Sequence, residues 1–228
     1  MMADATRDLR THLATLKALR GAPQDKPPRV AELKAWQSKR LAASYADVSA
    51  VPRYRAATAF FLDDLYGPKD FSGRDQAMLR IVPTMARLLP ASAVETAALA
   101  IELEALSEAL DQQTAAALAP GPITEATYAE AYRVTAPADR HRQIDLIIAV
   151  GDRLDQLVRK PLVSRTLKLM RNPARLAGMS DLQDFLERGY AAFRDMGGAS
   201  EFLATARARE ERTLNRLFSR EPDPFSQA

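Results

Sequence analysis

Cysteine is absent from this chain of 228 residues, and histidine occurs only twice. A chain without cysteine forms no disulfide, thiolate zinc site or iron–sulfur cluster, and it has no cysteine nucleophile. A ferritin-like di-iron site takes a Glu-x-x-His motif from each of two helices. Neither His12 nor His141 has a glutamate three residues earlier, and neither has the surroundings expected of a haem ligand. We therefore expect a protein that needs no metal and no cofactor.

Glycine-rich catalytic loops and long apolar runs are also missing. The nine glycines form none of the phosphate-binding loops Gly-x-x-x-x-Gly-Lys and Gly-x-Gly-x-x-Gly, and no Gly-x-Ser-x-Gly elbow of a serine hydrolase. The longest uncharged apolar run, 146–150, is far shorter than the roughly 20 residues that span a bilayer. The first eight residues have no apolar core of the kind found in signal peptides. These absences predict a cytoplasmic protein without a transmembrane segment.

Helix signals, by contrast, are dense along the whole chain. Apolar residues recur at helical spacing between proline and glycine breakers, and no segment keeps the alternation of a strand. The pattern predicts an all-α fold, an irregular bundle of about nine to ten helices with no sheet. The expected helices cover 4–20, 28–45, 52–66, 72–89 with a break near Pro83, 92–118, 124–133, 137–160, 161–172, 180–196 and 200–218.

Several helix ends and one helix face carry more specific signals. Ser92 with Glu95, and Ser180 with Gln183, have the spacing of capping boxes that begin helices. The pair 172–173, Asn-Pro, predicts the end of the helix that precedes it. Gly151 lies on the apolar face of its helix, where glycine weakens a helix, so we expect a neighbouring helix to approach closely there.

The breakers also divide the chain into parts. Residues 1–26 form an N-terminal helix whose attachment to the rest the sequence leaves open as loose. Residues 27–218 form the helical domain, in which 119–123, with its Pro-Gly-Pro run, is the best candidate for an internal boundary. Residues 219–228 contain two prolines among polar residues and predict a disordered tail.

Two adjacent carboxylates, Asp63 and Asp64, lie inside an aromatic and apolar helix end that Gly67 and Pro68 then stop. They point about 100° apart on a helix, so at most one can face the core, and the sequence does not decide which. A buried carboxylate needs a partner, and Arg55 and Arg74 are the nearest along the chain. We favour an ion pair or cap that fixes the turn over a carboxylate tuned for chemistry.

His141 and Asp145 are four residues apart and share a helix face with Asp152. Such a set fits half of a metal site or an acid–base pair. Arg140 and Arg142 flank His141 and would repel a cation. A surface pair is therefore the favoured interpretation.

Charge is unevenly distributed although the net charge is only +3. Residues 84–139 carry two basic and eight acidic side chains, whereas 140–175 carry nine basic and three acidic ones. Within 153–175, leucines alternate with arginine and lysine, which is typical of helices that bind an acidic partner or an anionic surface. That stretch has no aromatic residue for base stacking, so nucleic acid is not favoured. Internal pairing and solvated faces are the simpler interpretation of the same pattern.

The run 60–67, Phe-Phe-Leu-Asp-Asp-Leu-Tyr-Gly, followed by Arg74 and Asp75, resembles a motif of a bacterial family of helical proteins of unknown function. The similarity extends through 89–90, 102–107, 178–187 and 192–199. The resemblance implies a bacterial origin and one unit from about Pro27 to Phe218. It implies no activity, cofactor or catalytic residue.

Three hypotheses about function follow. The first is a non-catalytic interaction or regulatory protein that presents helical faces to a protein partner, in an oligomeric state that the sequence does not define. The second is a small-molecule-binding or sensory domain with a pocket near 60–66 and the break at Pro83. The third is an enzyme. The residues that these hypotheses involve are Phe60, Phe61, Asp64, Tyr66, Arg74, Asp75, His141 and Asp145.

Overall fold

The computed structural model describes residues 2–21, 27–65 and 90–226. Within these ranges the chain forms ten α-helices and one π-helical segment, and it has no strand, so the all-α prediction is confirmed. The elements are α1 (Met2–Arg20), α2 (Val30–Ser44), α3 (Ala46–Ala50), α4 (Pro52–Ala59), η2 (Phe60–Leu65), α6 (Ala91–Ala117), α7 (Glu125–Tyr132), α8 (Pro137–Val158), α9 (Pro161–Leu176), α10 (Ser180–Met196) and α11 (Ser200–Phe218).

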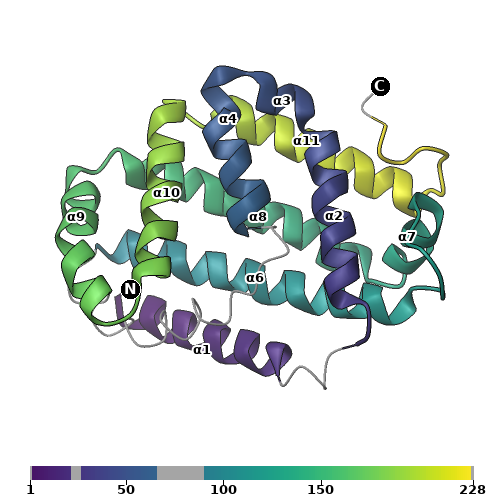
Figure 1. The fold of residues 1–228 in the computed structure, drawn as a ribbon, viewed down its shortest axis with the longest axis horizontal. Coiled ribbons are helices and arrows are strands. Elements are labelled where there is room, and N and C mark those ends of the chain that lie inside the picture. Colours follow the sequence, from purple (N-terminus) through teal and green to yellow (C-terminus); the bar gives the residue numbers. More distant parts are fainter. Residues whose placement is uncertain (1, 22–26, 66–89, 227–228) are drawn as a thin grey trace.

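The helices form two crossing layers (Figure 1). One layer contains α1, α6, α8 and α11, which lie side by side with α6 between α1 and α8. In front of it, α10, α4 and α2 cross α8 at steep angles. The short helix α7 lies at one end of the molecule and contacts α6, and α9 lies at the opposite end beside α10.

The N-terminal helix α1 is firmly packed on α6. Leu9, Leu13 and Leu16 recur at helical spacing and are buried against Ala98 and Ile101 of α6. Small residues on the α6 side let the leucines of α1 approach its backbone. The loose attachment that the sequence left open is therefore not what the structure shows.

Glycine sets the distance between α8 and α11. A Cβ at Gly151 of α8 would lie 2.4 Å from Cδ2 of Leu203 on α11, which is closer than carbon atoms approach without contact strain. The close helix approach predicted at this glycine is confirmed.

The chain beyond α11 folds back onto the molecule. Phe225 is buried against Trp36 of α2 and Tyr128 of α7, with ring centroids 5.9 Å and 5.8 Å away. Arg216 donates to the backbone oxygen of Ser226. This differs from the predicted disordered tail, because one aromatic side chain here has an apolar site to fill.

Candidate functional site

The described residues of the two layers leave a cavity of about 930 Å³ between them. Its walls come mainly from α2, α6, α7, α8, α10, α11 and η2, with smaller contributions from α9, from the end of α1, from residues 27–29 and from Thr58 of α4. We call the part towards α2 and α7 the polar end, and the part towards α9 and α10 the apolar end. The charged lining residues gather at the polar end, where they come from α2, from the C-terminal half of α6, from the first turn of α8 and from Glu210 of α11.

The π-helical segment η2 supplies the rings of the apolar end. Phe60 is buried and packs on Phe185 at 5.3 Å between ring centroids. Phe61 stacks on Phe202 at 5.7 Å and contacts Phe193 at 5.9 Å. The wider turn of a π-helix shifts the direction of successive side chains, so that both adjacent phenylalanines turn inward. The remaining wall here consists of aliphatic side chains of α8, α9 and α10 and of the rings of Phe185, Tyr190 and Phe202.

At the polar end, Glu108 of α6 is the centre of an ion-pair network. Its side chain is 2% exposed, and its Oε2 accepts a hydrogen bond from Nζ of Lys34 at 2.6 Å. Gln112 donates to its other oxygen at 3.1 Å, and Nε of Arg20 lies 3.7 Å away. Burial alone would raise the pKa of Glu108, but these donors and cations outweigh it and lower that pKa.

One turn further along α6, Asp111 is in a different situation. Gln37 donates to its Oδ1 at 3.0 Å, and the nearest ion-pair contact is Lys34 at 4.0 Å. Burial raises the pKa of Asp111 above its usual value, since the distant cations compensate only in part. Two carboxylates one turn apart thus have pKa shifts of opposite sign.

Arg140 of α8 is buried, at 3% exposure, and is held by neutral groups. Its guanidinium donates to Thr135, Thr114 and Gln143 at 3.0, 2.9 and 3.2 Å. Its carbon Cζ lies 4.0 Å from the ring centroid of Tyr132, which gives a cation–π contact. No carboxylate of the described residues lies within ion-pair distance of it.

Arg40 of α2 has fewer hydrogen-bond partners than Arg140. Its Nε and Nη1 are buried and have no hydrogen-bond partner. Its guanidinium lies 5.2 Å from the ring centroid of Phe225, and no described carboxylate pairs with it. Burial would lower the pKa of Arg40, but Glu210 and the tyrosines at positions 45, 128 and 132 together outweigh it and raise that pKa, so the side chain stays protonated. Oε1 of Glu210 itself accepts a hydrogen bond from Tyr45 at 2.8 Å.

The residues singled out from the sequence are only partly brought together. Phe60 and Phe61 line the cavity. The side chain of Asp64, and all of Tyr66, Arg74, Asp75 and Pro83, lie outside the described residues.

The other carboxylate and the histidine set lie on the surface. Asp63 is exposed. His141 is exposed, and Asp145 pairs with Arg207 of α11 at 2.8 Å. Among the described residues no group of three histidine or acidic side chains is arranged to hold a metal ion.

The sequence interpretation missed Arg40 and Arg140, although a signal was present. Arg40 lies seven residues after the buried Leu33, and Arg140 lies four residues before the buried Ile144. Both arginines therefore occupy the inward stripes of their helices. A charged residue on such a stripe predicts a buried charge with a specific task.

Comparison with known proteins adds one finding to this geometry. A family model described as Domain of unknown function (DUF8198) matches residues 17–224. The chain belongs to this family. No curated protein and no solved structure matches it. In the parts of the DUF8198 chain that the structure describes, no helix has the length and apolar character needed to cross a bilayer.

Proposed function

We propose that this protein is a non-catalytic binding or sensory protein that holds a small organic anion with an apolar body in the cavity between its helix layers. The observation that carries the proposal is the guanidinium of Arg40, which lines the cavity with two buried nitrogen atoms that have no hydrogen-bond partner.

An unpaired buried cation is strongly destabilising. A buried donor without an acceptor destabilises by about 1–3 kcal/mol, and more when the donor is charged. Such a group persists where a ligand satisfies it. The guanidinium has a planar fork of donors that matches carboxylates and phosphates in a bidentate manner. An anionic head group is therefore the best chemical match for Arg40.

The remaining charges of the polar end favour the same ligand. Glu108 is already bonded to Lys34 and Gln112, and Glu210 accepts from Tyr45. Arg140 adds a second guanidinium, and its hydrogen-bond partners Thr135, Gln143 and Thr114 are all neutral. The polar end thus presents two cations that lack a carboxylate partner among the described residues.

The apolar end favours a ligand with a hydrocarbon or aromatic body. Phe60 and Phe61 form part of its wall, together with aliphatic side chains of α8 and α10. A volume of about 930 Å³ lies within the range of small-molecule sites, about 300–1,000 Å³. The third hypothesis, an enzyme, has less support, because His141 and Asp145 lie on the surface and apart from the cavity.

Two dyes of the same shape test the proposal. Anilinonaphthalene sulfonate carries an anionic group, and phenylnaphthylamine has the same rings without it. We expect both to bind, and Arg40→Gln to weaken only the anionic dye, by about ten-fold or more, the equivalent of a lost hydrogen bond to a charged group. Arg55→Gln, at an exposed arginine of α4, is the matched control and should change neither.

The two failures have different meanings. If neither dye binds, the chain itself fills the cavity and the proposal is wrong. If both dyes bind but Arg40→Gln affects them equally, the cavity binds apolar molecules and the anionic head group is wrong. The docking of helical faces onto a protein partner stays a prediction beside this proposal.

A further inference from the structure

Helix α9 has a second apolar stripe that faces away from the core. Leu162, Leu169 and Leu176 are seven residues apart, so they lie on one face of the helix. Their exposed fractions are 54%, 77% and 87%. The inward face is formed separately by Val163 and Ala174, which are buried. A row of three exposed leucines is more than the scattered apolar residues of an ordinary surface.

The same helix is exclusively basic. It carries four cationic side chains and no acidic one. Arg171 is bonded to Glu187 of α10 at 2.7 Å. Arg165, Lys168 and Arg175 are exposed and have no ion-pair partner among the described residues. Around the helix these cations lie on one flank of the leucine row.

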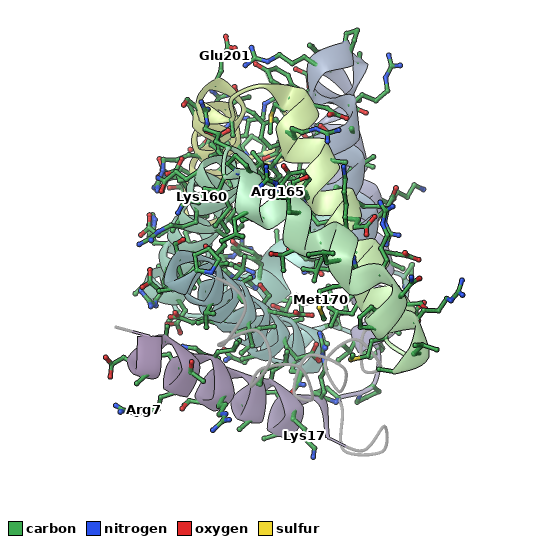
Figure 2. The ribbon with its side chains drawn as sticks, turned by 90° about the vertical axis from the view of Figure 1, so that its left-hand side faces the viewer. Arg7, Lys17, Lys160, Arg165, Met170 and Glu201 are labelled. Atoms are coloured by element: carbon green, nitrogen blue, oxygen red, sulfur yellow. The ribbon has the colours of Figure 1, made fainter. Side chains whose placement is uncertain are left out.

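Figure 2 shows where this helix lies. α9 runs along the outside of the molecule, on the face turned to the viewer, with Lys160 and Arg165 near one end and Met170 further along. A straight helix from Leu162 to Leu176 spans about 21 Å. Its outward face can therefore contact a flat surface over its full length.

We propose that α9 binds the surface of an anionic lipid bilayer, lying in the plane of the interface with Leu162, Leu169 and Leu176 inserted among the lipids. Cationic side chains beside an apolar stripe are the pattern of helices that bind membranes in this orientation. The leucines supply the apolar contact, and Arg165, Lys168 and Arg175 lie beside the lipid head groups. This proposal is independent of the cavity.

Two other partners could cover this face of α9, namely a second copy of the chain and an acidic protein, and both fit it less well than a bilayer. A second copy of the chain would bring four cations against four cations, which like-charge repulsion opposes. An acidic protein would satisfy the charge, but it would also need a groove that fits the leucine row. A bilayer is fluid, so the three leucines can insert into it without a groove of matching shape. The exposed leucines therefore favour a bilayer as the partner of α9.

Flotation with lipid vesicles tests this surface. One vesicle is phosphatidylcholine alone, and the other contains equal parts of phosphatidylcholine and phosphatidylglycerol. We expect binding to the anionic vesicle only, and weaker binding as salt is added. The double variant Leu169→Ser with Leu176→Ser should lower the partition coefficient of the protein onto the anionic vesicles by about ten-fold or more, because two inserted side chains are lost. The double variant Arg165→Gln with Lys168→Gln should lower the same partition coefficient by about five-fold for each cation removed.

Matched controls use exposed residues elsewhere. Val134→Ser removes an apolar side chain that is 57% exposed, and Arg55→Gln with Arg212→Gln removes two exposed cations. Neither control should change partitioning. The leucines of the test variants are exposed, so those variants should keep the helical circular dichroism of the parent protein.

Three results would overturn the proposal. The first is equal binding to both vesicles or to neither. The second is loss of binding in the controls as large as in the α9 variants. The third is tight, leucine-dependent binding to an acidic polypeptide without lipid binding, which would assign α9 to a protein partner. Arg40→Gln should leave vesicle binding unchanged whether or not the cavity binds a ligand.

Discussion

The ring of Phe60 lies directly against the backbone of Gly189. A Cβ at position 189 would be 2.7 Å from Cζ of that ring. Phe60 also contacts Phe185, one turn before the glycine on α10. The absence of a side chain at Gly189 therefore lets η2 approach α10 and fixes the apolar end of the cavity.

Gly189→Ala is expected to destabilise the protein by up to about 2 kcal/mol. Alanine is better than glycine in a helix interior by about 1 kcal/mol, but forcing Phe60 out of its position costs about 1–3 kcal/mol. Urea unfolding measures the net change. In a Phe60→Leu background the overlap is relieved, and the alanine should then be neutral or stabilising. An equal loss in both backgrounds would show that the ring is not the obstacle.

Neutralising Glu108 should destabilise the protein, whereas neutralising Asp111 should not. Glu108→Gln leaves Lys34 and Arg20 without their buried anion, and we expect a loss of about 3 kcal/mol at neutral pH. Asp111→Asn keeps an acceptor for Gln37 and removes a carboxylate whose pKa burial has raised, so it should be neutral or stabilising. Thermal unfolding of the two variants at neutral pH compares them directly.

The pH dependence of stability separates the same two residues. Because the pKa of Glu108 is lowered on folding, its stabilising contribution is complete above the unfolded value of 4.5 and is lost as pH falls through the folded pKa. Because the pKa of Asp111 is raised, stability falls as pH rises from 3.8 to the folded pKa. Glu108→Gln should remove the loss of stability at low pH, and Asp111→Asn should remove the fall in stability as pH rises above 3.8. A profile that neither substitution alters would contradict the assignment.

Arg40→Met should stabilise the protein when no ligand is bound, by about 1 kcal/mol or more. The substitution replaces a half-buried cation, two of whose nitrogen atoms are buried without a hydrogen-bond partner, with an apolar side chain of similar length. Arg140→Met is the matched comparison, since it removes three hydrogen bonds and should destabilise by about 2–4 kcal/mol. Differential scanning calorimetry gives both values. A lower midpoint for Arg40→Met would mean that the guanidinium has a partner inside the protein.

Phe225→Ala should expose the only tryptophan of the chain to water. Phe225 covers one edge of Trp36 and one face of the Arg40 guanidinium. We expect a red shift of the Trp36 emission and a loss of about 3 kcal/mol, at the low end for a buried phenylalanine. Glu221 lies in the same segment but is exposed, so Glu221→Ala should change neither the Trp36 emission nor the stability. An unchanged emission spectrum would place residue 225 away from Trp36 in solution.

The bodies of the helices could be predicted from the sequence because their apolar stripes are regular. The ends were less predictable, because tertiary contacts compete with local capping. Helix α6 begins at Ala91, and the hydroxyl of Ser92 accepts from Lys160 instead of capping it. The amide of Gln183 donates to the backbone of Leu167 on α9, so the second predicted capping box is also wrong. Helix α9 continues through Pro173, whose missing amide falls in its last turn.

The candidate site was predictable only in part. The phenylalanines of the apolar end were identified because they lie beside one another in an otherwise apolar run. The arginines could have been found from their positions on inward stripes. Their surroundings could not, because Thr114 and Phe225 are 26 and 185 residues away from the arginines they contact. Only the fold brings these residues together.

Helix α6 has α1 on one side and α8 on the other. Its amides are therefore shielded by neighbours that would have to separate at the same time before solvent could enter. Deuterium from heavy water should reach the middle turns of α6 last. The slowest-exchanging peptides would then identify α6 as the helix that stays folded while the other helices unfold locally.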